Sequence, residues 1–183
     1  MGAKTMKWHR KWTWFIGVAV LGLSLVLTGC SNSSTETGRA VVKSQAPKVS
    51  RVAASKQIRN NGGLWYFTRS LKDKSNSGLE VFTFDKKGKV TAYNVKKYYR
   101  SYQAAKKAKG LREFGQGTYQ MKTNQQKQTT LTLKMKLSGI PATYQFKLMK
   151  AMATKHQNLI FNGFKASRTV DGDTVNGLFV QAK

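Results

Sequence analysis

The sequence has few acidic residues, a single cysteine and two histidines, and each shortage excludes a class of protein. Its 183 residues include 33 lysines and arginines but only 7 aspartates and glutamates, which gives a formal net charge of +26. So basic a chain is not a mimic of an acidic substrate, and an anionic partner or surface is the first idea to test. The lone cysteine excludes an intramolecular disulfide and a zinc cluster built from cysteines.

Motifs for catalysis and metal binding are scarce as well. His9 lies near the N-terminus and His156 lies in a polar stretch typical of a turn, so a histidine-based zinc site would lack ligands. No G-x-S-x-G motif accompanies His156, and no glycine-rich loop continues into Lys-Ser or Lys-Thr. We expect no catalytic site, no metal site and no cofactor. A hydrolase that pairs Glu80 with Glu113 or Asp85 stays open as an alternative.

The first residues of the chain have the layout of an export signal. Residues 1–14 carry four basic residues and no acidic one, and the uncharged apolar run Phe15–Leu27 follows. A helix needs about 20 apolar residues to span a bilayer, so this run is short for a permanent span. It has the length of the apolar core of a signal peptide.

The tetrapeptide Leu27-Thr28-Gly29-Cys30 follows directly and resembles the lipobox of bacterial lipoproteins. The resemblance implies that a diacylglyceryl lipid is attached to the Cys30 thiol and that the chain is cleaved after Gly29. The mature protein would then be held on the outer face of the bacterial cytoplasmic membrane by this lipid. An uncleaved anchor helix with an incidental cysteine is the alternative.

Composition divides the rest of the chain into a tether and one domain. Residues 31–59 are polar and contain no aromatic residue, so they bury too little apolar surface to offset the entropy of ordering. We therefore predict a signal peptide at 1–29, the lipidated cysteine and a flexible tether at 30–60, and a β-domain at 61–183. A short helix over residues 49–59 is the one element considered within the tether.

Short runs of alternating residues predict antiparallel strands throughout the domain. Thr129–Leu137 and Ala142–Leu148 each place leucine, methionine or aromatic residues on one face and threonine, lysine or glutamine on the other. Asp171-Gly172-Asp173 is typical of a hairpin turn. The remaining strands are predicted at 64–69, 79–85, 90–95, 117–123, 158–162, 164–169 and 175–182.

The predicted fold class is mainly β, a single antiparallel barrel or sandwich of about eight strands with one short helix. That helix covers Tyr102–Lys109, with Ser101 as its N-cap and Gly110 just past its end. Gly63-Leu64-Trp65 opens the first strand and resembles the Gly-x-Trp signature of lipocalins and lipocalin-like lipoproteins. In that family the tryptophan closes the base of the barrel, often beneath an arginine from a late strand, for which Arg168 is the candidate.

This second resemblance is incomplete, because the family's Thr-Asp-Tyr loop is absent. Trp65 as an ordinary core residue of another small β-fold is therefore the alternative. A lipocalin-like carrier or sensor of a small apolar ligand is the corresponding function.

Charge points to a different function for the mature chain. Loss of the four basic residues of the signal leaves 29 basic against seven acidic residues, a net charge of +22. For an exported, lipid-anchored protein the nearest polyanions are wall polymers and lipid headgroups. No motif for reading nucleic acid is present, although tyrosines at 93, 98, 99 and 102 lie among lysines. We expect a binding module for anionic surfaces, without nucleic acid as a partner.

Overall fold

The computed structural model describes residues 46–50, 52–60, 62–72 and 78–183. Leu27, Thr28, Gly29 and Cys30 lie outside the described residues, as does most of the predicted tether. The described part contains two helices, α1 (Ala54–Asn60) and α2 (Tyr102–Lys107), and eight strands. The strands are β1 Trp65–Thr68, β2 Leu79–Phe84, β3 Lys89–Val95, β4 Arg112–Thr123, β5 Thr129–Leu137, β6 Ile140–His156, β7 Leu159–Val170 and β8 Asp173–Ala182.

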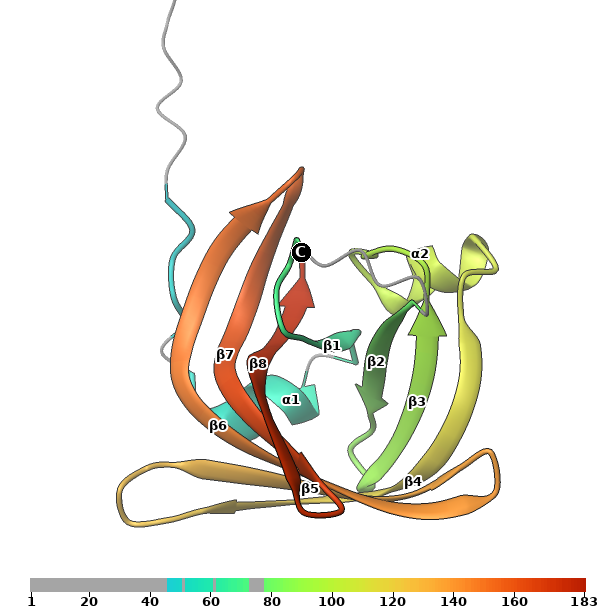
Figure 1. Ribbon diagram of the computed structural model, residues 1–183. Coiled ribbons are helices and arrows are strands. Elements are labelled where there is room, and N and C mark those ends of the chain that lie inside the picture. The colour runs from blue at the N-terminus through green and yellow to red at the C-terminus, as the bar shows by residue number, and fades with distance from the viewer. Residues whose placement is uncertain (1–45, 51, 61, 73–77) are drawn as a thin grey trace, which may run out of the picture. The chain divides into compact units, whose positions relative to one another are not determined.

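The eight strands form a closed antiparallel barrel in sequence order (Figure 1). Each strand pairs with the next along the chain, and β8 returns to β1, where Val180 lies opposite Tyr66. The predicted class, mainly β, is confirmed, and the return of β8 to β1 decides between a barrel and a sandwich. Closure leaves the barrel without a free sheet edge, which removes a site of edge-to-edge aggregation.

Aromatic side chains fill the barrel interior. The Trp65 ring stacks on Phe179 with 5.2 Å between ring centroids, and Phe82 meets Phe146 edge to face at 5.8 Å. Leu131 and Leu133 of β5 are fully buried beside them. Alternation along β5 leaves Lys134 exposed on the other side of the wall, as the sequence pattern predicted.

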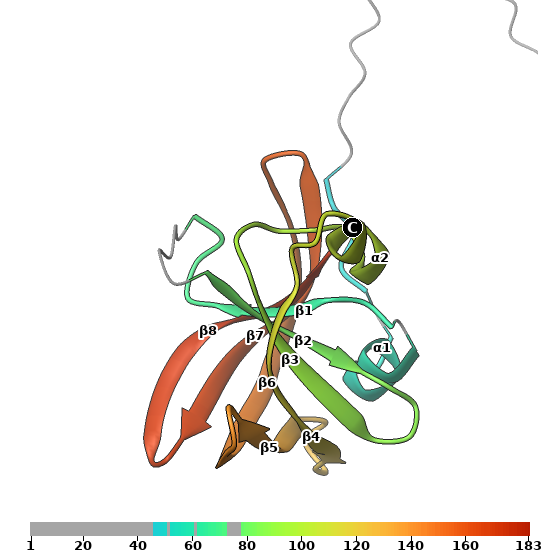
Figure 2. The same ribbon diagram turned by 90° about the vertical axis from the view of Figure 1, so that its right-hand side faces the viewer.

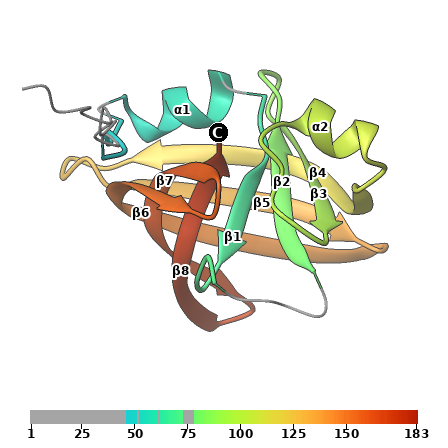
Figure 3. The ribbon, with the colours of Figure 1, turned by 90° about the horizontal axis from the view of Figure 1, so that it is seen from above.

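Helix α1 lies across one end of the barrel (Figures 1 and 3). Its Ile58 is fully buried and belongs to the same apolar cluster as Trp65. The sequence predicted a flexible tether through residue 60, with a short helix as an option. The burial of Ile58 places α1 within the folded domain, so the domain begins before residue 61.

A second apolar layer covers part of the outer wall. Tyr66, Val81 and Phe161 point outward from β1, β2 and β7 and are fully buried in a cluster with Ala105 of α2, which packs outside the barrel (Figure 2). Ser101 caps α2 as predicted, because its hydroxyl oxygen accepts a hydrogen bond from the Ala104 amide at 3.1 Å.

Three predicted strand boundaries were wrong. β4 begins at Arg112 rather than at 117, and β6 continues past Leu148, across a bulge, to His156. The two strands predicted at 158–162 and 164–169 are the single strand β7. Gly163 interrupts its pattern without ending it, because a Cβ atom there would overlap the backbone of Phe179 and Val180 on β8. Gly163 therefore permits the close approach of β7 to β8 and does not mark a turn.

Candidate anion-binding surface

The carboxylates considered for catalysis lie in separate places. Glu80 points into the barrel, and Asp85 sits in the β2–β3 turn, where it accepts hydrogen bonds from the Lys87 and Lys89 amides at 2.8 Å. Glu113 accepts a hydrogen bond from the Gln116 side chain. Each carboxylate has a local partner, and the contacts do not gather them into one cleft.

His156 and the Asp171-Gly172-Asp173 segment are the other polar positions that the sequence analysis considered. His156 is the last residue of β6, beside the β6–β7 turn. Among the described residues, no three histidine, cysteine or acidic side chains are grouped so that they could hold a metal ion. Asp171 and Gly172 both have left-handed backbone and form the β7–β8 turn, which confirms the hairpin predicted there.

The residues of the lipocalin resemblance lie on the barrel wall, in and just before β1 and on β7. Trp65 is buried at the start of β1 and Gly63 is buried just before it, at the end of the barrel that α1 covers. The Arg168 guanidinium lies 4.5 Å from the centroid of the Phe67 ring and 5.2 Å from that of Tyr144. Arg168 thus stands over Phe67, two residues beyond Trp65, toward the end of the barrel opposite α1.

Arg168 forms an ion pair with Glu80 at that end. Both side chains are about one-fifth exposed. Burial raises the pKa of the Glu80 carboxyl, and the Arg168 charge together with hydrogen bonds from Arg168 and Tyr144 opposes that rise. The end of the barrel opposite α1 therefore contains a charged pair, whereas the end that α1 covers is closed by the apolar Ile58 side chain.

A row of cationic and hydroxyl side chains crosses the outer face of four strands. Lys89 of β3 lies opposite Thr118 of β4, which lies opposite Lys134 of β5, which lies opposite Thr143 of β6. A parallel row follows one step along the strands, from Thr91 through Gln116 and Lys136 to Pro141. Side chains on one row of a sheet stand about 4.8 Å apart from strand to strand.

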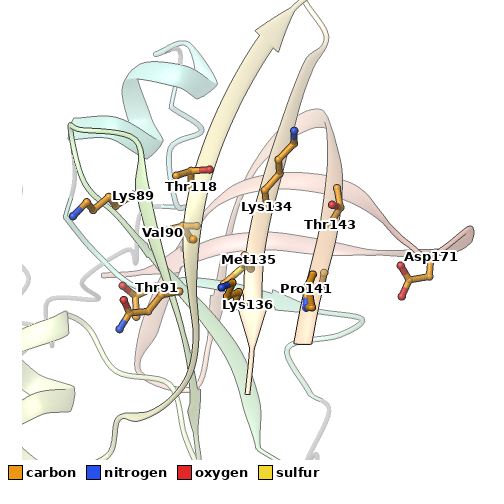
Figure 4. A pocket seen from close by; sticks show the side chains of 13 residues that line it. Lys89, Val90, Thr91, Thr118, Lys134, Met135, Lys136, Pro141, Thr143 and Asp171 are labelled. Carbon is orange, nitrogen blue, oxygen red and sulfur yellow. The ribbon is translucent and has the colours of Figure 1, made fainter. Parts of the chain in front are cut away.

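We call this surface the lysine–threonine face. It comprises the outward side chains of residues 116–122 on β4, 130–136 on β5 and 141–147 on β6, together with Lys89 and Thr91 of β3. Part of it is hollowed into a groove of about 820 Å³ (Figure 4). Figure 4 shows Lys89 and Asp171 at opposite edges of this groove, with Lys134 between them.

Positive charge on this face is little neutralised. Its lysines are exposed, and they are Lys89, Lys122, Lys134, Lys136 and Lys147. Among the described residues that line the groove, Asp171 is the one acidic residue. Within the part of the chain that the structure describes, the ion pair between Arg168 and Glu80 is the only one, so these lysines have no carboxylate within 4.0 Å. A surface of this kind attracts anions from solution.

Comparisons of the chain with protein-family models, with curated proteins and with solved structures found no match. Neither of the two described helices is both long and apolar enough to cross a bilayer.

The sequence pattern placed Lys134, Lys136 and Lys147 on a wet face. The groove itself needs the register of four strands, which joins Lys89 to Thr143 across 54 residues of chain.

Proposed function

We propose that the protein is a bacterial envelope lipoprotein whose β-barrel binds anionic wall polymers or lipid headgroups through the lysine–threonine face. Its role is binding and not catalysis. The observation that carries this proposal is the row from Lys89 to Thr143, in which amino groups alternate with hydroxyl groups and no carboxylate intervenes. An extended polyanion with repeated charges can meet several such groups at once.

The spacing of the lysines supports an extended partner. Lys134 and Lys136 are two residues apart on one strand, about 7 Å, while Lys89 and Lys134 are two strands apart, about 10 Å. Threonine and glutamine between them offer hydrogen bonds to sugar or phosphate oxygens. Individual contacts of this kind are weak in water and are screened by salt, so several are needed for useful affinity.

Attachment to the membrane rests on the sequence. The charged start, the apolar run and Leu27-Thr28-Gly29-Cys30 support lipidation of Cys30. Two acyl chains supply the two hydrophobic signals that stable anchoring requires. The bound lipid is the only non-protein group in this proposal. The barrel would then be presented to the wall from the outer side of the cytoplasmic membrane.

The alternative function, a carrier or sensor of a small apolar ligand, needs an apolar cavity inside the barrel. Stacked rings of Trp65, Phe179 and Phe164 and the Phe82–Phe146 pair occupy that space. The described residues give no observation in favour of the carrier, so binding by the outer face is the better-supported function.

Lipidation is tested with Cys30→Ser in the full chain. The variant lacks the thiol that the lipid requires, so we expect unprocessed precursor to accumulate. Gel mobility reports whether the chain is processed, and metabolic labelling with a radioactive fatty acid reports whether it carries the lipid. A labelled mature form of normal size in the variant would contradict the lipoprotein assignment.

Binding is tested with the double variant Lys134→Gln/Lys136→Gln against purified wall polymer and phosphatidylglycerol vesicles. Loss of two charge contacts should weaken binding about tenfold at low salt and reduce its salt dependence. The matched control, Lys86→Gln/Lys87→Gln, removes two exposed charges from the β2–β3 turn. Equal losses in both variants would show that net charge, and not this face, governs binding.

A further inference from the structure

A second group of cations surrounds a smaller pocket away from the lysine–threonine face. This pocket has a volume of about 450 Å³ and lies where the end of β3, the residues after α2 and the start of β4 meet. Lys96, Lys109 and Arg112 line it, and none of its described lining residues is acidic. It shares no residue with the groove on the lysine–threonine face.

One wall of the pocket is fixed by a buried tyrosine. The Tyr66 hydroxyl accepts a hydrogen bond from the Tyr99 amide at 2.8 Å and donates one to the Tyr99 carbonyl oxygen at 3.2 Å. Tyr66 itself is fully buried, and burial raises the pKa of its phenol, so the hydroxyl remains a donor at neutral pH. The segment that carries Lys96 and Tyr99 is therefore held in place before any ligand arrives.

Another part of the lining is formed by the residues at the C-terminal end of α2. Gly110 donates a hydrogen bond to the Ala105 carbonyl at 2.9 Å, and Lys109 donates one to that of Lys106 at 3.0 Å. Lys109 has left-handed backbone with φ of 49°, at the position where helices usually place glycine. Gly110 has a different reason for being glycine, because a Cβ atom there would overlap the Tyr99 hydroxyl.

We infer that this pocket binds a phosphate group, either a monoester or a diester carried by a small molecule or a lipid headgroup. Three cations, with no carboxylate among the described lining residues, suit a ligand anion with several oxygens. A ligand with only one carboxylate group would leave part of the positive charge without a partner. The Arg112 guanidinium offers the planar pair of donors that phosphate accepts. The volume lies within the range of small-ligand sites, so the pocket has room for the group that the phosphate is attached to. This site goes beyond the proposed function, which uses other residues.

The left-handed backbone of Lys109 gives a precise test. Lys109→Gly removes the side chain at a position that glycine adopts readily, so the melting temperature should be unchanged or higher. Lys127→Gly is the matched control, since Lys127 also has left-handed backbone, with φ of 60°, and lies outside this pocket in the β4–β5 turn. Each variant loses one positive charge.

The measurement is isothermal titration calorimetry on the detergent-purified full chain with four soluble probes: inorganic phosphate, glycerol 3-phosphate, glycerophosphoglycerol and acetate. We expect phosphate compounds to bind, acetate to bind at least tenfold more weakly, and Lys109→Gly to lose about tenfold in affinity while Lys127→Gly does not. Preference for glycerophosphoglycerol identifies a headgroup diester, and preference for glycerol 3-phosphate identifies a soluble monoester.

The inference is overturned if no phosphate compound binds, if acetate binds equally well, or if both glycine variants lose affinity equally. Calorimetry of Lys109→Gly judges the phosphate site, and polymer and vesicle binding of Lys134→Gln/Lys136→Gln judges the lysine–threonine face. The phosphate site and the polymer-binding face can therefore fail separately.

Discussion

The two sides of the outer barrel wall differ in what covers them. Over β1, β2 and the adjoining part of β8, outward residues such as Tyr66, Val81 and Val180 are fully buried beneath α2 and the segments beside it. Over β4, β5 and the first half of β6 the outward residues are mainly threonine, glutamine and lysine, and most are exposed. The same strand geometry thus makes a second core on one side and a binding surface on the other.

The sequences of the strands record this difference. Trp65–Thr68 is buried at every position because both its faces are covered, whereas β5 alternates between buried leucines and outward threonines and lysines. Continuous apolar runs are typical of strands covered on both sides, and alternation is typical of strands with one wet side. The hydrophobic pattern of a strand therefore indicates whether its outer face is buried, as well as that the segment is a strand.

The largest test of the comparison removes an aromatic ring from the covered side. Phe161→Ala should lower the free energy of unfolding by about 3–5 kcal/mol, because it leaves a cavity beneath α2. Gln145→Ala, on the lysine–threonine face, should change it by less than about 0.5 kcal/mol. Urea denaturation measures both values. Similar losses would mean that the two sides are not energetically distinct.

A smaller effect concerns polar groups placed inside the wall instead of outside it. Arg168→Ala should lower the free energy of unfolding at pH 7 by about 2 kcal/mol, because it leaves the Glu80 carboxylate half-buried without its cation. Lys147→Ala, which removes a lysine from the open side, should have almost no effect. Equal effects would place the Arg168–Glu80 pair among ordinary surface pairs.

The same pair makes stability depend on pH in a stated direction. The pKa of Glu80 in the folded state is raised above the ordinary value of 4.5, so the folded protein takes up a proton before the unfolded chain does. As pH falls from 7 toward 4.5, this group therefore increases the free energy of unfolding, and as pH rises through its folded pKa that gain is lost. Arg168→Ala should enlarge the gain and Glu80→Gln should abolish it in denaturation curves at several pH values.

The smallest expected effect tests how the segment before α2 is attached to the barrel wall. Tyr66→Phe keeps the ring and removes both hydrogen bonds to the Tyr99 backbone, so unfolding should become easier by about 1–2 kcal/mol. Hydrogen exchange of the Tyr99 amide should accelerate at the same time. An unchanged exchange rate would show that packing alone fixes the segment before α2.

Some elements follow from neighbouring residues, and others do not. The Ser101 cap, the Gly172 turn with φ of 92°, and the β5 alternation depend on local chemistry, and the sequence predicted all three. The continuous strand β7 was missed because the reason for Gly163 lies on β8. The buried Ile58 was missed because its partners follow it in the chain and form the barrel that it closes.

The candidate surfaces divide in the same way. Lysines on the wet faces of β5 and β6 were predicted from period-two alternation, since side chains of one strand alternate by covalent geometry alone. Arg168 was the sequence's candidate for the arginine above Trp65, and its guanidinium lies over Phe67, because the register of β7 against its neighbours sets how far along the wall it stands. Lys109 was predicted only as the last residue of a helix and Arg112 was not singled out, since only the end of α2 and the start of β4 bring them to one pocket.

The sequence by itself determined the mainly β class, most of the strands, the net positive charge and which β5 and β6 residues face water. These properties follow from composition and from alternation within one strand. Tertiary structure decided that the barrel is closed, that rings fill its interior, and that lysines from β3 and β5 share one groove. The physical reason is that register and closure are set by pairing between distant segments, and no single segment contains that information.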